Sequence, residues 1–459
     1  MQIPVISSFL ELSNAPRRFL FFTAFNIVSW QCIVGPAMIL FARRMEMPAS
    51  WVGFLISFMP FSTLLVVFTA PLVARFGAKR LMFTMWLLRN LVMCVVFLMP
   101  WVLSKGDPRL GWHLLMGATL AFCIFRALGS GGWFPWLHEV VPPTERGAYF
   151  SAEAASTQLV NVGIILAQGA MLAGEPGVNR FLYIYAVGVT AGLISLLWMS
   201  RVPGGAAFGT EVRLSGAFEA HRRAGADRPF LVFVLLAAFC FSCTAWFGSA
   251  CVLYLRDALL LTPKRVMLLT AMGSVGVLLT IRYWGRFADY SGSGRAMLKT
   301  LIGHSLAALA FLGLPPGAWW TPWAIWPLVM LTSIFGAAFW MAAHRAMLNY
   351  VKEDGRVGYT NLWTIGTALT LGATPIAAGW LIQYWGLWGF RTCFLIAGTA
   401  GLLGALACDW LVRDGLQAAR ARMWPLDPML PVRTLVRIAW ITVGLHESNR
   451  PRPHDGPAA

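Results

Sequence analysis

Arg126 stands inside a long apolar run, where a charged side chain is costly to bury. The run covers residues 112–137, and at about 1.5 Å per helical residue Arg126 is about 21 Å from Trp112 and about 16 Å from Leu137. In a helix that crosses a bilayer, this depth places the guanidinium near the midplane. The position indicates contact with a solute or a structural pairing with a neighbouring carbonyl or carboxylate, and we favour the first.

Arg89 is a second arginine within an apolar run, which covers residues 81–103. It is about 12 Å from the nearer end of that run, a distance that its long side chain can cover. We therefore expect Arg89 to extend towards the membrane surface rather than to face a central site.

Two other apolar runs carry a row of polar side chains on one helical face. In the run 150–173 the row has spacings of four, four and seven residues, and a row of threonines occurs in the run 359–384. Such rows line a water-filled cavity or hydrogen-bond to a neighbouring helix, and both interpretations stay open. Asn161 is the best candidate for contact with a solute, because it is deeper than Glu153. The two rows are Glu153, Thr157, Asn161 and Gln168, and Thr360, Thr364, Thr367 and Thr374.

Tryptophans recur within the apolar runs at positions that match between the two halves of the chain. Indole offers a flat apolar face and one hydrogen-bond donor, which suits sugar rings and aromatic groups. Each of these tryptophans is a candidate for a binding site, with plain packing as the alternative. Asn26 and Ser242 each lie four residues before one of them. The four tryptophans are Trp30, Trp133, Trp246 and Trp340.

The sequence offers no constellation of side chains for catalysis. The apolar runs contain no paired carboxylates, histidine cluster or nucleophile beside a base, so we expect no enzyme, cofactor or metal. Cys240-x-x-Cys243 has redox or metal spacing, but it lies in an apolar run without a second ligand pair. We expect its two thiols to pack as buried side chains.

The elements that position these residues are membrane helices. Of the 459 residues, 58% are hydrophobic and 12% are charged, and the apolar runs are long enough to cross a bilayer. They are too long and too continuously apolar for barrel strands. The predicted fold is an all-α integral membrane protein with twelve transmembrane helices in two pseudo-symmetric bundles of six. The predicted spans are 19–42, 51–74, 81–103, 112–137, 150–173, 180–200, 229–255, 265–284, 296–315, 321–343, 359–384 and 388–411.

The net charge of +17 follows the predicted topology. Roughly 24 of the 36 Lys and Arg residues fall in the tails and the alternate loops that share one side of the membrane, and about 9 fall on the other side. Cytoplasmic loops carry such an excess of basic residues, so we place both termini in the cytoplasm. The basic charge is therefore no indication of a nucleic-acid partner.

The two halves of the chain repeat each other at an offset of about 215 residues. Pro48 and Pro263 each precede the second span of their half, and Trp30 and Trp246 each lie within the first span of their half. The predicted domains are a first bundle, residues 1–200, a cytoplasmic linker, 201–228, a second bundle, 229–411, and a cytoplasmic tail, 412–459. A duplicated six-helix unit is typical of transporters whose halves rock around a site at the midplane.

Gly285-Arg-Phe-Ala-Asp-Tyr-Ser-Gly292, followed by Arg295, is a polar stretch that we predict to be a loop between two spans. It resembles the signature loop of the major facilitator superfamily, G-x-L-a-D-r-x-G-r-k, with both glycines and the aspartate in place. The first-half copy ends at Gly77 and has Ala70 and Ala74 where the first glycine and the aspartate are expected. The resemblance covers all twelve spans and implies transport by alternating access.

The resemblance also implies which residues bind solute and which form a gate. The family's central cavity is lined by the helices that carry the four tryptophans, and the polar loop packs under the start of a helix of the opposite half. A carboxylate there meets the positive end of the helix dipole. The implied binding residues are Asn26, Trp30, Arg126, Trp133, Asn161, Trp246 and Trp340, and the implied gating residues are Gly77, Arg146, Gly285, Arg286, Asp289, Gly292 and Arg356.

The predicted function is secondary active or facilitative transport of a small organic solute, with a lean towards an organic anion or a ring-bearing, sugar-like solute. One alternative is a proton-coupled drug-type exporter, because Arg126-Ala-Leu-Gly-Ser-Gly-Gly132 partly matches the arginine motif of such antiporters. The other is a transporter-like receptor or assembly factor that does not transport. Coupling to a proton or another cation stays open. We expect a monomer in the lipid bilayer of a bacterial plasma (inner) membrane.

The tail contains an apolar stretch, residues 432–445, that is too short for a comfortable span and is interrupted by Arg433 and Arg437. This composition predicts an amphipathic helix lying at the membrane interface. A thirteenth span and a disordered tail are the alternatives.

Overall fold

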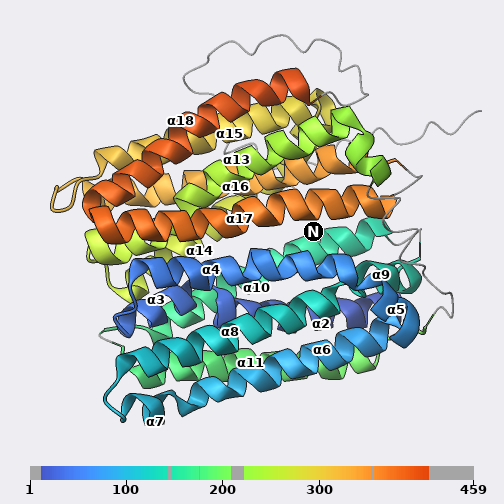
Figure 1. Ribbon diagram of the computed structural model, residues 1–459, viewed down its shortest axis with the longest axis horizontal. Helices are drawn as coiled ribbons and strands as arrows, with labels where there is room; N and C mark the ends of the chain where they lie inside the picture. The colour runs from blue at the N-terminus through green and yellow to red at the C-terminus, as the bar shows by residue number, and fades with distance from the viewer. Residues whose placement is uncertain (1–11, 143–145, 175, 208–221, 353–355, 413–459) are drawn as a thin grey trace, which may run out of the picture.

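The computed structural model describes residues 12–142, 146–174, 176–207, 222–352 and 356–412. Within these ranges the chain is helical and contains no strand, and the long helices run side by side (Figure 1). The predicted helix in the tail lies outside the described residues.

The first half of the chain forms one bundle, drawn in blue to green in Figure 1. Four of its predicted spans are interrupted: a glycine separates the first into two helices, short 3-10 segments divide the second and third, and a turn at Gly131 and Gly132 divides the fourth. Its elements are α2 (Asn14–Val34), α3 (Pro36–Arg44), α4 (Ala49–Thr63), η1 (Leu64–Phe68), α5 (Ala70–Phe76), α6 (Ala78–Met93), η2 (Cys94–Leu98), α7 (Met99–Leu103), α8 (Pro108–Ser130), α9 (Trp133–Val140), α10 (Arg146–Met171) and α11 (Val178–Ser200).

The second half forms the other bundle, drawn in green to red in Figure 1. Its helices are longer and less interrupted than those of the first half. Its elements are α13 (Arg228–Leu253), η3 (Tyr254–Ala258), α14 (Pro263–Ser291), α15 (Ser293–Ala310), η4 (Phe311–Gly313), α16 (Thr321–Tyr350), α17 (Arg356–Trp385) and α18 (Leu387–Leu411).

The fold class predicted from the sequence is confirmed, with one difference in the fifth span. Eleven helical stretches in the described ranges are long and apolar enough to cross a membrane. Helix α10 is not among them, although its 26 residues run alongside the other long helices (Figure 1). It carries the polar row that includes Asn161 and Gln168, and these side chains lower its hydropathy.

The two ends of the bundles are packed differently. We call them the Arg43 end, where α3 ends and α4 begins, and the Gly77 end, where α5 ends and α6 begins. Towards the Arg43 end, one hydrophobic cluster includes buried side chains of both halves, such as Met47, Val52, Met267 and Ile382. Towards the Gly77 end, each half has a separate cluster of its own. In the part of the chain that the structure describes, the halves therefore share a core only towards the Arg43 end.

Close helix packing across the halves accounts for the shared core. Helix α4 packs against α17, and α10 packs against α14. A Cβ atom built on Gly53 of α4 would lie only 2.3 Å from the Pro375 carbonyl oxygen of α17. A Cβ atom on Gly379 would lie 2.5 Å from the Ala49 carbonyl oxygen. The absence of side chains at these glycines lets the two backbones touch, so the halves meet tightly along this seam.

Gly77 and Gly292 form equivalent turns at the Gly77 end. Their φ angles are +84° and +86°, in the left-handed region that glycine adopts without a steric penalty. The prediction of a polar loop from Gly285 to Gly292 is wrong, because α14 continues to Ser291 and only Gly292 breaks the helix. The first-half copy, Ala70–Phe76, is likewise a helix. The repeated feature is a helix that ends abruptly at a glycine.

Candidate functional site

A cavity of about 290 Å³ lies within the first half, on the side of the shared core that faces the Gly77 end. Helices α2, α6, α8 and α9 supply its walls, so four separate segments of the chain meet there. Its lining is aromatic and cationic. The lining residues are Thr23, Asn26, Trp30, Trp86, Arg89, Arg126, Ser130 and Trp133.

Arg126 is held at the cavity wall by two neighbours. Its guanidinium carbon lies 5.0 Å from the centroid of the Trp30 ring, within the range of a cation–π interaction. One terminal nitrogen donates to the Thr63 hydroxyl at 3.0 Å. The Nε atom has no hydrogen-bond partner in the described part of the chain. Arg126 therefore lines the cavity, as the sequence suggested, and keeps unused donor capacity.

Arg89 is fully buried, so the prediction that it extends to the membrane surface is wrong. Its guanidinium carbon lies 4.7 Å from the Trp86 ring centroid and 5.1 Å from the Phe122 ring centroid. It donates to the Asn26 amide oxygen, which also accepts a hydrogen bond from Trp86 Nε1 at 3.0 Å. These contacts turn the side chain inwards because the two aromatic faces and the amide replace the water that it would meet at the surface.

The cavity has two cationic side chains and no carboxylate in its lining. Neither Arg89 nor Arg126 forms an ion pair with any described residue, and an unpaired buried charge carries a large desolvation cost. Hydrogen bonds and cation–π contacts offset part of that cost, and an anion would offset more. The ion pairs of the described ranges lie elsewhere, at Arg43–Asp257, Arg295–Asp409 and Lys352–Asp227.

Asn161, a predicted binding residue, forms a hydrogen bond between two helices. Its amide oxygen accepts a hydrogen bond from Gln31 of α2 at 2.8 Å. Gln168 of the same row donates to the Gln31 carbonyl at 3.1 Å. In the second half, the hydroxyls of Ser242 and Thr374 lie 2.9 Å apart across α13 and α17. These members of the polar rows therefore hydrogen-bond to a neighbouring helix, and none of them lines the cavity.

The four symmetry-matched tryptophans have different surroundings. Trp30 and Trp133 line the cavity, whereas Trp246 packs against the core shared by the two halves. Trp340 stacks on His344 with ring centroids 5.5 Å apart. Trp86 lines the cavity without having been predicted, and its position three residues before Arg89 was the available signal.

Some of the predicted gating residues can be placed. Gly77 and Gly292 are the turn glycines, Gly285 lies within α14, and Arg286 is exposed. A Cβ atom on Gly77 would lie 2.7 Å from the Gly205 carbonyl oxygen, so the start of the linker rests on this turn. The other three, Arg146, Asp289 and Arg356, lie in helices, and their side chains are outside the described part of the structure.

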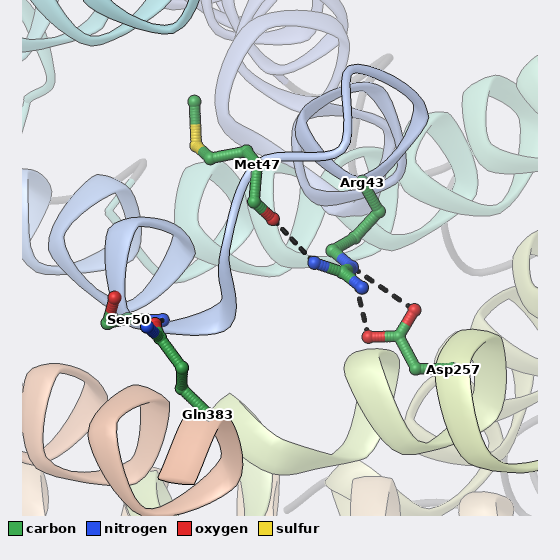
Figure 2. A network of polar contacts seen from close by, with 5 residues as sticks. All are labelled: Arg43, Met47, Ser50, Asp257 and Gln383. Carbon is green, nitrogen blue, oxygen red and sulfur yellow. Dashed lines mark hydrogen bonds and ion pairs between the residues drawn. The ribbon is translucent and has the colours of Figure 1, made fainter. Parts of the chain in front are cut away.

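At the Arg43 end, polar contacts join the two halves (Figure 2). Arg43 Nε of α3 lies 3.0 Å from one carboxylate oxygen of Asp257 in η3 and donates to the other at 3.1 Å. Arg43 also donates to the Met47 carbonyl. The Ser50 backbone amide donates to the Gln383 side chain of α17 at 3.2 Å. This contact was not predicted from the sequence, although Arg43 and Asp257 are separated by about one repeat length.

The comparisons with known proteins agree with this architecture. The family model of the Major Facilitator Superfamily matches residues 234–444. No curated protein matches the chain. A variant of the nucleoside transporter NupG has a similar structure, with a TM-score of 0.66 and 10% sequence identity over 87% of this chain and 100% of that one.

Two other transporters have similar structures. A D-xylose–proton symporter has a TM-score of 0.61 and 12% identity, over 87% of this chain and 98% of its own. A bacterial homologue of the iron transporter ferroportin has a TM-score of 0.65 in its inward-facing state, at 16% identity over 88% of this chain and 100% of its own. In the outward-facing state its TM-score is 0.61, at 15% identity over 87% and 99%. The predicted resemblance to major facilitator transporters is confirmed.

Proposed function

On the premise that the chain is a membrane protein with the major facilitator fold, we propose that it moves a small organic solute across the membrane by alternating access. The difference between its two ends carries this proposal. At the Arg43 end the halves share one hydrophobic core and an ion pair, whereas at the Gly77 end each half has its own core. Halves that are sealed at one end and separate at the other are what such a cycle requires.

The distribution of Lys and Arg supports an orientation in which the Gly77 end faces the cytoplasm. Roughly 24 of the 36 Lys and Arg residues fall on the side of the Gly77 end, which we assign to the cytoplasm of a bacterial cell with both termini on that side. The described conformation is then closed outside and separated inside.

The cavity supports an organic anion or a ring-bearing compound as the solute. Its charged side chains are both cationic, and its largest side chains are tryptophans. A volume of about 290 Å³ lies at the lower end of the range of small-molecule sites, about 300–1,000 Å³. A drug-sized lipophilic cation fits neither the charge nor the size of this cavity, which disfavours a drug-type exporter.

A ligand screen followed by a transport assay tests this function. Purified protein is first screened for solutes that raise its melting temperature, because a ligand that binds only the folded state stabilises it. Each hit is then tested for counterflow in proteoliposomes. We expect at least one hit to exchange across the membrane, with loss of binding in Arg126→Ala for anionic hits. Ligands that bind but never exchange would instead indicate a receptor on a transporter scaffold.

A further inference from the structure

The two arginines of the cavity differ in what they offer to a solute. Arg89 is fully buried, and Trp86, Phe122 and Asn26 occupy the surroundings of its guanidinium. Both arginines have a buried Nε atom without a hydrogen-bond partner among the described residues. Arg126 differs because its side chain is partly exposed and lies against the Trp30 ring. A solute in the cavity therefore has access to the donors of Arg126 and not to those of Arg89.

Thr63 fixes the position of the Arg126 guanidinium. Its hydroxyl has a single hydrogen, which it donates to the Met59 carbonyl at 3.0 Å, so the oxygen is free to accept from Arg126. Thr63 is the last residue of α4, the helix that packs against α17 of the other half. The hydrogen bond from Arg126 to Thr63 thus connects the cavity to the seam between the halves and orients the guanidinium before any solute arrives.

The accessible aromatic side chains suit a flat ring beside the charge. Trp30 and Trp133 are only partly buried, whereas Trp86 is 4% exposed. Trp133 is itself stacked on Phe19, with centroids 4.9 Å apart, so its orientation is fixed. Indole faces stack on planar rings in offset or edge-on arrangements and gain about 0.5–1.5 kcal/mol beyond the burial of area.

Charge, ring and size together define one class of ligand. We propose that the cavity binds a small aromatic carboxylate, with Arg126 in contact with the carboxylate and Thr63 as the positioning residue of Arg126. This inference rests on the proposed function, because it assigns the solute class of the same cavity. It goes further by giving Arg89 a structural role, in which it holds Asn26 and Trp86 in place.

Four probes separate the contribution of charge from that of the ring. They are benzoate, its neutral analogue benzamide, the non-planar cyclohexanecarboxylate, and acetate, each titrated against the purified full-length protein by calorimetry. We expect benzoate to bind at least tenfold more tightly than benzamide or acetate and several-fold more tightly than cyclohexanecarboxylate. Equal affinity for benzoate and benzamide, or no binding of benzoate at millimolar concentration, would overturn the proposal. Equal affinity for benzoate and cyclohexanecarboxylate would overturn the assignment of an aromatic ring.

Variants test the two assigned roles. Arg126→Lys keeps the charge but loses the planar fork of donors, so we expect at least a tenfold loss of benzoate affinity. Thr63→Val should weaken benzoate severalfold and reduce the preference for benzoate over benzamide, and Thr63→Ser should restore both. A purely structural role of Thr63 would leave that preference unchanged. Thr119→Val is the matched control, because this buried hydroxyl of α8 has no partner among the described residues and lies outside the cavity.

Counterflow of benzoate, measured in parallel, distinguishes this inference from the proposed function. If benzoate binds tightly but no solute is exchanged, the proposed ligand class is supported and the proposed transport function is wrong. If the protein exchanges another solute but does not bind benzoate, transport is supported and the proposed ligand class is wrong.

Discussion

The Arg43 end and the Gly77 end are built from equivalent parts of the two repeats, yet among the described residues a core common to both halves lies only towards the Arg43 end. At the Arg43 end, α4 and α17 touch backbone to backbone and Arg43 pairs with Asp257 across the seam. At the Gly77 end, the ion pair between Asp227 and Lys352 lies within the second half. In the described ranges, the contacts at the Arg43 end cross between the halves, whereas the ion pair at the Gly77 end stabilises one half.

The largest effect is expected from filling the seam. Gly53→Leu places a side chain where even a Cβ atom would be 2.3 Å from the Pro375 carbonyl oxygen. Overpacking of this kind costs about 1–3 kcal/mol, so the closed Arg43 end should lose population. Labelling of cysteines introduced beside the seam would detect this as increased accessibility. Gly117→Leu is the control, since a Cβ atom there would meet nothing within 4 Å. Equal accessibility in both variants would contradict the assigned seam.

A smaller effect is expected from the ion pair. Asp257→Asn leaves Arg43 without its charged partner, and because both side chains remain about one-quarter exposed the cost should be about 1 kcal/mol. The exchanged pair, Arg43→Asp with Asp257→Arg, should recover most of this loss. A double-mutant cycle on the same accessibility assay measures the coupling. A coupling energy of zero would mean that the pair contributes nothing to closure.

The amide contact at the same end should matter less. Gln383→Leu removes the acceptor of the Ser50 backbone amide, a neutral hydrogen bond worth about 0.5–1.5 kcal/mol. Because water can replace this partner at the mouth of the seam, we expect the lower value. The change should increase accessibility at the Arg43 end and leave the Gly77 end unchanged. An effect larger than that of Asp257→Asn would reverse the order of importance proposed for these contacts.

The smallest effect is a dependence on pH at the Gly77 end. Burial raises the pKa of Asp227, but hydrogen bonds from Lys352 at 2.6 Å and Tyr359 at 2.8 Å outweigh it and hold the pKa below its ordinary value. A lowered pKa stabilises the fold above the ordinary pKa of about 3.9, and this stabilisation is lost as the pH falls further. The melting temperature should therefore fall less steeply in acid for Asp227→Asn than for the wild type.

Asp227→Asn also tests whether this ion pair acts within one half. Because Asp227 and its partners lie within one half, Asp227→Asn should not change the separation of the halves at neutral pH. A change in separation would show that this pair acts across the halves.

The sequence predicted the features that depend on long apolar runs. It predicted fewer of the features that depend on contacts between side chains. Spans, repeat and fold class followed from the length and spacing of the runs. The prediction for Arg89 was wrong because its depth in the span does not show that the Trp86 and Phe122 rings lie against its guanidinium. The roles of Asn161 and of the gating residues as solute or gate contacts stay predictions.

The repeat also contains a signal for the ion pair between the halves. Arg43 and Asp257 occupy nearly equivalent positions in the two halves, and residues close to a pseudo-twofold axis face their own counterparts. Opposite charges at matched positions near the axis therefore predict an ion pair between halves. Arg126 has no such charged counterpart in the second half, so the charge of the cavity comes from the first half alone.

Distances between spin labels at the two ends test alternating access most directly. One pair of labels spans the halves at the Arg43 end and another spans them at the Gly77 end, in protein reconstituted into lipid with and without a transported solute. Without solute, we predict a short, narrow distance at the Arg43 end and a longer one at the Gly77 end. During turnover, the first should lengthen as the second shortens. Distances that stay fixed, or that change together in the same direction, would contradict the account.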